Sequence, residues 1–488
     1  MLIGLLLFTP AILIGWLLVH CFATPLRRPG WTGVTLELSL GVGLGIGVVS
    51  MVYFTLLWAG AAGRIVLLSA EALMIAGGVW LSVRRPAVKS EPAPAAHPSW
   101  MLWLLRAAAV LVLLIFALDT ARSLEATPDG GWDAFTIWNL KAKFLAGGPS
   151  TWRNLLAPVG GPRHALFGAN HPGYPLLVPA AVASAWTLQG ETASAIPAAL
   201  DVLFAFATAA ILCGAVAWLQ GEAAGLIALL VLLASEGFAS QAGSQNADIP
   251  VALYLLGTLA LMAMARDRRW PHGLLLLAGL YCGLAAWTKN EGLPFAILAI
   301  AVAAWTGGRK VAGWMALGAL PPLLLLAAFK VLLVHDTEAL FPKTLHEAFS
   351  KATDPSRWMQ ILASFIQSIW QMGIPWAHPV LLVAIVAFAL GLAPRTLRRK
   401  QLWLAIPVVG LLAADFAAYL LTTADLNWQL STSNVRLIVQ VWPAVLLLAF
   451  LVIAPPALAE DRALEMQRPV RGKAERKRGK GSRVLNAR

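Results

Sequence analysis

The sequence NADIPVALYLLGTLALMAMARDRR (246–269) contains the pattern that decides the fold. An uninterrupted apolar run, near 249–265, lies between a polar turn and a group of arginines. Such a run approaches the ~20 residues that a helix needs to cross the hydrocarbon core of a membrane. Its apolar residues are continuous rather than alternating, which argues against a strand of a β-barrel. The segment therefore predicts a membrane-spanning helix with its basic residues at one end.

The same pattern recurs along most of the chain. Of the 488 residues, 59% are hydrophobic and 12% are charged, a charged share about half that of ordinary soluble domains. This composition excludes a soluble enzyme, a single-anchor receptor and a disordered tail protein. We expect an all-α polytopic membrane protein of about 13 transmembrane helices. The expected spans lie near 2–22, 35–59, 64–83, 100–119, 193–219, 221–239, 249–265, 272–288, 290–306, 311–334, 377–394, 401–422 and 435–455.

The basic residues predict a single orientation for these helices. Short cytoplasmic loops of membrane proteins are rich in Lys and Arg. Two other apolar segments, near 172–188 and 358–374, would break the agreement if they crossed the membrane, so we expect them to lie as helices at the outer interface. With the N-terminus outside, the inner loops contain the main basic clusters, which are Arg27/Arg28, Arg84/Arg85/Lys89, Arg266/Arg268/Arg269, Arg309/Lys310 and Arg395/Arg398/Arg399/Lys400.

The chain divides into three parts. Residues 1–99 are expected to be accessory transmembrane helices followed by a Pro/Ala-rich cytoplasmic linker, and residues 100–455 the main membrane domain. Residues 456–488 form a basic tail that supplies much of the net charge of +13. Such a tail is typically solvated at the cytoplasmic face, where it also attracts anionic membrane lipids. No nucleic-acid-binding fold surrounds the tail, so no nucleic acid partner is expected.

The first outer loop, near 120–192, contains the sequence TPDGGWDAFTIWNLKAKF (127–144). Long loops in compact proteins are usually functional. Asp133 precedes a short amphipathic helix, where it acts either as an N-cap or as a general base at the membrane surface. Asp129 lies in a Pro-Asp-Gly-Gly turn, in which Asp is common. On the helix we expect the apolar side chains to lie toward the membrane and Lys141 to be more exposed.

Another cluster in the same loop reads HPGYP (171–175). It cannot begin as a regular helix, because each proline disfavours helix at the residue before it. The cluster is either a rigid turn that leads into the next helix or a device that holds His171 and Tyr174 at the outer surface.

The second outer turn places Asn246 and Asp248 at the start of the span quoted first. Asp248 either caps that helix, with Pro250 in its first turn, or binds a polar substrate group. One Asp and one Asn make no recognisable metal-binding spacing.

Two further outer turns contain basic residues beside a span. Lys289 and Glu291 interrupt a long apolar run. They form either a solvated ion pair at a hairpin tip or a site in which the lysine meets a phosphate. The last turn, near 423–434, leads to Arg436, which either snorkels to the interface or binds a phosphate through its planar fork.

Charged residues inside the predicted spans favour a different function. Ionisable groups within a membrane are functional candidates, and a proton-coupled transporter would use them. These residues are Glu37, Glu71, Arg106, Asp201, Lys330 and Asp415.

Several of these motifs occur together in one order: Asp133, Tyr174-Pro175, the Asp-x-Pro at 248–250, Thr288-Lys289 and the turn that ends in Arg436. The set resembles the membrane glycosyltransferases of the GT-C fold. The likeness is to the bacterial group that includes lipid A aminoarabinose transferases, rhizobial lipopolysaccharide sugar transferases and the protein O-mannosyltransferase family. It covers residues 100–455, which would be a GT-C-like catalytic membrane domain with outer juxtamembrane helices.

The resemblance implies transfer of a sugar from a polyprenyl-phosphate donor to a glycan, lipid or protein acceptor. The reaction would occur at the outer face of the bacterial cytoplasmic membrane. Asp133 would be the catalytic base, Asp248 the second family carboxylate, and Lys289 and Arg436 would lie near the lipid phosphate. The other candidates for substrate binding are Asp129, Lys141, His171, Tyr174, Asn246 and Glu291.

One departure from the family bears on cofactors. Family members commonly have paired acids at the first position, whereas Ala134 follows Asp133 here. No metal ligand is therefore assigned, and a divalent metal is the one cofactor left open. A transporter or flippase of lipid-linked sugars and an O-antigen polymerase or ligase are the alternative functions.

Overall fold

The computed structural model describes residues 1–26, 30–84, 100–156, 171–334, 341–374 and 377–456. This part of the chain is built of helices, without a β-strand among its described residues. The fold class predicted from the sequence is thus confirmed as all-α. The predicted linker up to residue 99 lies outside the described residues from 85 onward, as does the basic tail from 457 onward.

Eight of the described helices are long and apolar enough to cross a membrane, as expected for a multi-pass helical membrane protein. The predicted number of about 13 is not confirmed. Several expected spans are shorter apolar helices, because glycines and other breaks divide the runs. The eight long helices are α3 (Trp31–Trp58), α4 (Arg64–Arg84), α5 (Trp100–Ala126), α9 (Ala195–Gln220), α12 (Asp248–Asp267), α15 with η4 (Arg309–Ala328 and Phe329–Leu333), η5 with α20 (Leu402–Leu404 and Ala405–Leu421) and α21 (Leu426–Val452). The shorter ones are α2 (Thr9–Phe22), α8 (Leu177–Gln189), α10 (Glu222–Leu233), α13 (His272–Thr288), α14 (Gly292–Gly307) and α18 (Pro379–Leu390).

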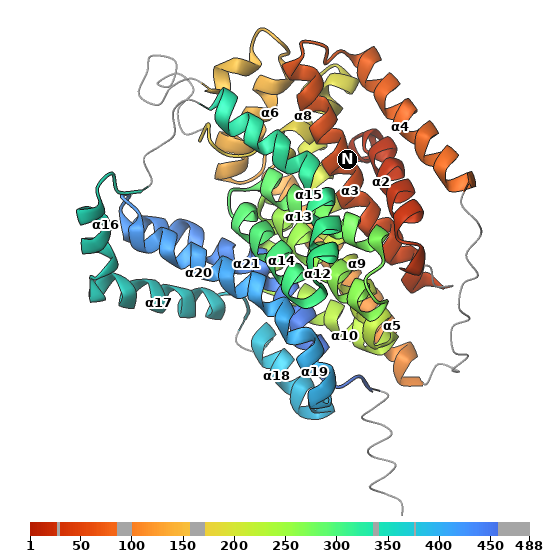
Figure 1. The fold of residues 1–488 in the computed structure, drawn as a ribbon, viewed down its shortest axis with the longest axis vertical. Helices are drawn as coiled ribbons and strands as arrows, with labels where there is room; N and C mark the ends of the chain where they lie inside the picture. Colours follow the sequence, from red (N-terminus) through yellow and green to blue (C-terminus); the bar gives the residue numbers. More distant parts are fainter. Residues whose placement is uncertain (27–29, 85–99, 157–170, 335–340, 375–376, 457–488) are drawn as a thin grey trace, which may run out of the picture.

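The centre of the bundle is α12, the segment with which the sequence argument began. It packs against α9, α13 and α21, which surround it in Figure 1. The apolar stretch of α12 is entirely buried inside the protein, so neighbouring helices cover it on every side. Its two ends therefore present Asp248 and Arg266 on opposite faces of the bundle.

At the Arg266 end of α12, arginine side chains pack on tryptophans of other helices. The Arg266 guanidinium lies 5.0 Å from the ring centroid of Trp403, and that of Arg268 lies 5.1 Å from the ring of Trp218. At another helix start, Arg106 donates hydrogen bonds to both carboxylate oxygens of Glu222, at 2.6 and 3.0 Å. This paired geometry is a specific ion pair between two helices.

The N-terminal helices α2 and α3 pack closely through glycines. A Cβ atom built on Gly45 of α3 would lie 1.7 Å from the carbonyl oxygen of Ala11 in α2. Helix α3 also contacts α8 and α9, and the Tyr254 hydroxyl donates to the Gly43 carbonyl at 2.8 Å. The first helices are therefore packed into the bundle.

Replacing Gly45 with Ala should push α2 and α3 apart. Overpacking of this kind costs about 1–3 kcal/mol, because a Cβ cannot occupy the space of a backbone carbonyl. We expect a lower melting temperature of the purified protein in detergent. The matched control is Gly77→Ala in α4, where no atom lies within 4 Å of the added Cβ and alanine should be neutral or stabilising. Equal melting temperatures for the two variants would contradict this packing.

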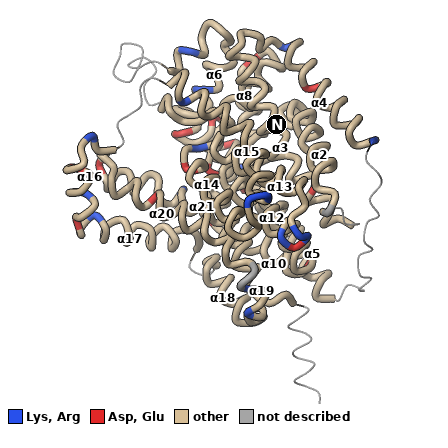
Figure 2. The backbone as a smooth tube through the Cα atoms, viewed as in Figure 1, with Lys and Arg blue, Asp and Glu red and all other residues tan. Residues whose placement is uncertain are grey.

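The two apolar segments that were predicted to lie at the outer interface differ in how deeply they are buried. Helix α8, expected near 172–188 at the membrane interface, is instead buried between α3, α6 (Asn139–Ala146) and α9. Its run of alanines allows neighbours to approach on all sides. By contrast, α17 (Pro355–Trp370) buries only Ile361 and Ser368. Together with α16 (Leu345–Ala352) it projects from the bundle in Figure 1, and Figure 2 shows charges of both signs on this pair.

Helix α21 begins earlier than the sequence suggested. The segment 423–434 was expected to be a polar turn, but the helix starts at Leu426. Asp425 is its N-cap, and its carboxylate accepts a hydrogen bond from the backbone N–H of Trp428 at 2.7 Å. Arg436 therefore lies about 15 Å along a continuous helix, where the helix axis rather than a loop fixes its position.

Candidate active site

A charged cluster joins segments that are far apart in the sequence. The guanidinium of Arg436 donates through Nε to Asp248 Oδ2 at 2.7 Å and through Nη1 to Asp133 Oδ2. Lys289 Nζ lies 3.1 Å from Asp248 Oδ1 and 3.1 Å from Glu291 Oε1. Five of the ten predicted site residues thus form one connected network, which we call the charged cluster.

Each member comes from a helix end or a helix near the same face. Asp248 is the first residue of α12, Lys289 directly follows α13, and Asp133 directly precedes η2 (Ala134–Trp138). Arg436 reaches them from within α21. These polar turns, predicted to be outer, therefore come together because the helices that end in them are neighbours in the bundle.

Neither aspartate acts as the helix cap that the sequence allowed. Asp133 is the N-cap residue of η2 by position, but its side chain makes no capping hydrogen bond there. Asp248 lies inside the first turn of α12, with Ala247 at the cap position and no side-chain cap. Both carboxylates bind cations from other helices instead, because charge-assisted hydrogen bonds are stronger than neutral ones.

The side chains of the two aspartates differ in their exposure to solvent. The Asp248 side chain is fully buried, whereas the Asp133 side chain is 30% exposed. Asp248 also accepts a hydrogen bond from Gln440 Nε2 at 2.6 Å, so both of its oxygens are used. Among the described residues, Asp133 Oδ1 has no hydrogen-bond partner. Asp248 is thus the anchor of the cluster, and Asp133 is its accessible carboxylate.

The lysine of the cluster stays charged although it is buried. Burial would lower the pKa of Lys289, but the carboxylates of Asp248 and Glu291 outweigh this effect and hold its pKa above the usual value. An ammonium group in a poorly hydrated site interacts strongly with nearby anions. The Nη2 group of Arg436 has no partner within the described residues and adds two free N–H donors.

Tyr174 and His171 lie beside the cluster as a stacked pair. Their ring centroids are 4.9 Å apart, and Tyr174 also stacks on Trp138 at 5.7 Å. Burial raises the pKa of Tyr174 to about 12, and the charge of Glu291 acts in the same direction. His171 has a φ of 41°, an uncommon conformation for a residue other than glycine. The HPGYP segment is therefore a rigid turn that also places both rings near the charges.

Lys141 was expected to be exposed, and the structure contradicts this. Its side chain is fully buried, and Nζ donates to the carbonyls of His171 at 2.7 Å and Tyr174 at 3.3 Å. Trp138, expected to face the membrane, is buried as well. The helix after Asp133 is covered by α8 on the side that the sequence pattern assigned to water. Lys141 thus holds the HPGYP turn in place, behind the cluster.

Asn246 and Asp129 lie apart from the charged cluster. Asn246 is buried, and its Nδ2 lies 3.5 Å from Gln241 Oε1. The side chain of Asp129 is exposed, and its backbone carbonyl accepts a hydrogen bond from Asn139 at 3.1 Å. Within the ranges that the structure describes, no three His, Cys, Asp or Glu side chains form a group suited to a metal ion. The carboxylates of the cluster are separated by its cations, so they do not fit a metal centre.

Gln440 was not a candidate in the sequence, and Lys330 was one only as a charge inside a predicted span. Gln440 follows Arg436 by four residues, which places both on one face of α21. Lys330, in η4, donates to Asn290 Oδ1 at 2.8 Å and to the carbonyl of Gly173. It thereby ties the Lys289–Glu291 turn to the HPGYP turn. The i, i+4 spacing from Arg436 was the one signal in the sequence that could have indicated Gln440.

No protein-family model, curated protein or solved structure matches this chain. The resemblance to the GT-C glycosyltransferases therefore rests on the sequence motifs alone.

Proposed function

We propose that the protein is a membrane glycosyltransferase that takes its sugar from a polyprenyl-phosphate donor. The observation that carries the proposal is the bridge that Arg436 makes between Asp133 and Asp248. Arg436 has a free Nη group that can bind a phosphate, and the accessible carboxylate of Asp133 beside it can act as a general base. The acceptor would be an envelope glycan, lipid or protein.

The chemistry requires one bond to form and one to break. The acceptor oxygen attacks the anomeric carbon of the donor, and the bond from that carbon to the phosphate oxygen breaks. The phosphate leaves with the bonding electrons, and Arg436 and Lys289 stabilise its developing charge. Asp133 accepts the proton of the acceptor hydroxyl through Oδ1. Direct attack inverts the configuration at the anomeric carbon.

The distribution of charges supports a site at the outer face of the membrane. The charged cluster lies at the opposite face of the bundle from Arg266 and Arg268. Loops rich in Arg and Lys are retained on the cytoplasmic side. The active site would then open at the outer face of a bacterial cytoplasmic membrane, where lipid-linked sugars replace nucleotide donors.

The direct test is sugar transfer by the purified protein in liposomes that contain polyprenyl-phosphate sugars. Deleting the gene and comparing lipid-linked and envelope glycans by mass spectrometry would identify the donor, because it should accumulate. A polymerase or ligase would instead consume a lipid-linked oligosaccharide and transfer the whole glycan. Movement of the lipid-linked sugar across the bilayer without transfer would reject the enzyme.

Arg436→Gln should weaken binding of the donor. Hydrogen bonds to charged groups contribute about 1.5–3 kcal/mol, so the KM for the donor should rise roughly 10- to 100-fold. The control is Arg357→Gln on α17, whose guanidinium donates to backbone carbonyls of the described residues, such as that of Leu420 at 3.1 Å. Initial rates at varied donor concentration give the KM of both variants. An unchanged KM in Arg436→Gln would reject the phosphate role.

The rival function, a transporter of lipid-linked sugars, is favoured by buried carboxylates in the long helices. Glu71, Asp201 and Asp415 are each buried, and Glu71 Oε2 and Asp201 Oδ1 lack a hydrogen-bond partner among the described residues. Such groups often mark proton pathways. Proton-dependent uptake of a fluorescent lipid-linked sugar by liposomes that contain the protein would support transport.

A further inference from the structure

Gln245 has an unusual backbone conformation close to the charged cluster. Its φ is 57°, in the left-handed region that residues other than glycine seldom adopt. It lies three residues before Asp248. Conformations of this kind persist where surrounding contacts fix them, and they gather at functional sites.

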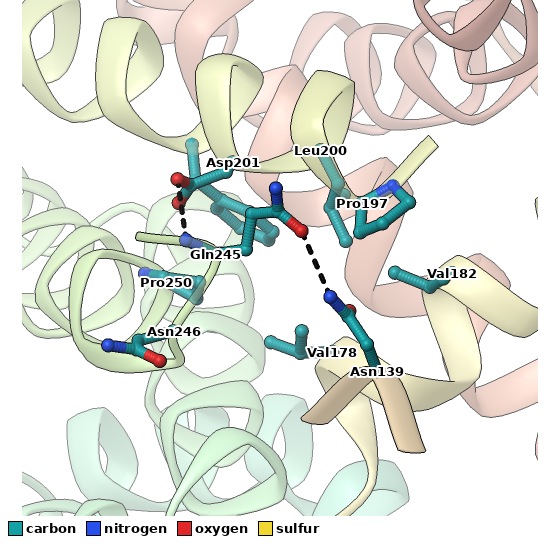
Figure 3. A pocket seen from close by; sticks show the side chains of 10 residues that line it. Asn139, Val178, Val182, Pro197, Leu200, Asp201, Gln245, Asn246 and Pro250 are labelled. Carbon is teal, nitrogen blue, oxygen red and sulfur yellow. Dashed lines mark hydrogen bonds between the residues drawn. The ribbon is translucent and has the colours of Figure 1, made fainter. Parts of the chain in front are cut away.

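Three hydrogen bonds hold Gln245, from both backbone and side chain. Figure 3 shows the bonds to Asp201 and Asn139. Its backbone N–H donates to Asp201 Oδ2 at 2.9 Å. Its side-chain Oε1 accepts from Asn139 Nδ2 at 2.9 Å, and its Nε2 donates to the carbonyl of Pro128 at 3.0 Å. We call these four residues the Gln245 clamp.

The clamp joins the two segments that carry the aspartates of the charged cluster. Pro128 and Asn139 flank Asp133 on either side along the chain, and Gln245 leads into Asp248. The carboxylate of Asp201, on α9, fixes the Gln245 backbone from a third element. A change at Gln245 would therefore shift one aspartate relative to the other.

The polar groups of the clamp do not form a second substrate site. Asn139, Asp201 and Gln245 are buried, at 6%, 3% and 3% exposure. The cavity between them has a volume of about 10 Å³, about the space of one water molecule. No sugar or phosphate group fits there, so the clamp acts through what it holds.

We propose that Gln245 is a positioning residue that sets the geometry between Asp133 and Asp248. This inference rests on the proposed function for its effect on rate. Its effect on geometry can be measured without any substrate, which keeps the two proposals separable.

A disulfide can report the geometry. A Cβ atom built on Gly131 lies 4.0 Å from Ser244 Cβ, within the range of about 3.5–4.5 Å that a disulfide requires. In a protein whose own three cysteines are replaced by alanine, the pair Gly131→Cys and Ser244→Cys should oxidise rapidly. Adding Gln245→Gly should slow this oxidation clearly, as measured by mass spectrometry of free thiols. An equal rate of oxidation with and without Gln245→Gly would overturn the proposal.

Kinetics test the effect on the reaction. Glycine adopts the left-handed backbone of Gln245 without strain, so Gln245→Gly removes the side-chain hydrogen bonds while the backbone remains allowed. We expect kcat to fall by about 10²-fold, the effect of a misplacement of about 1 Å, with little change in the KM for the donor. Arg269→Gly is the control, because Arg269 is exposed with a φ of 62° at the opposite face.

Rescue separates positioning from folding. Oxidising the Gly131→Cys, Ser244→Cys pair in the Gln245→Gly background should restore much of the lost kcat, and a reductant should remove the gain. A kcat that stays low after oxidation, or a Gln245→Gly variant as active as Arg269→Gly, would overturn the proposal. Wild-type protein that transfers no sugar would overturn the proposed function instead, while the oxidation rates would still decide the clamp.

Discussion

Asp133→Asn should leave the protein folded in membranes and reduce sugar transfer by about 10²–10⁴-fold, the usual contribution of a general base. Asparagine has nearly the same shape, and its side-chain oxygen can still accept the hydrogen bond from Arg436. It cannot accept the proton of the acceptor hydroxyl. The loss should therefore appear in kcat, measured in liposomes with saturating donor, and the KM for the donor should change little.

The control for this variant is Asp129→Asn in the same loop. The Asp129 side chain is exposed. Asp129→Asn removes one negative charge from the loop, as Asp133→Asn does. We expect Asp129→Asn to keep near-normal activity. If Asp133→Asn also retains near-normal turnover, Asp133 is not the base. If instead its KM for the donor rises while kcat is preserved, its role is to orient Arg436.

The convergence of the charged cluster was largely predictable from the sequence. Asp248, Lys289 and Arg436 each occur beside an apolar span, and the distribution of arginines assigned all three to one side. Common sidedness limits such residues to one face of the bundle, but it does not determine which of them meet. The pairing of Asp133 with Arg436 required the positions of α12, α13 and α21 relative to each other.

Other features could not be predicted because they depend on packing. The amphipathic pattern after Asp133 distinguished a polar from an apolar side, but it could not indicate that α8 covers the polar side and buries Lys141. The sequence did not indicate the early start of α21, because the first turns of this helix are polar. Gln440 and Gln245 are uncharged, so nothing in the charge pattern indicated them, and their partners are distant in sequence.

Asp248 should matter for stability as much as for function, because it is the fully buried anchor of two cations. Removing one partner of a buried ion pair typically costs about 3–5 kcal/mol, since the other charge stays buried and unpaired. Asp248→Leu should therefore lower the free energy of unfolding in mixed detergent micelles by an amount of this order. Asp248→Asn should cost less, because its oxygen still accepts one hydrogen bond.

A control variant distinguishes the loss of the Asp248 ion pairs from the loss of an acidic residue as such. Asp425→Asn makes the same chemical change at an exposed N-cap, where asparagine caps as well as aspartate, so its stability should be close to that of the wild type. Arg436→Met combined with Asp248→Leu should cost less than the sum of the two single changes, because the double variant removes a charge together with its partner. Additive costs would mean that Asp248 and Arg436 do not stabilise each other, and that Lys289 is the cation that stabilises Asp248.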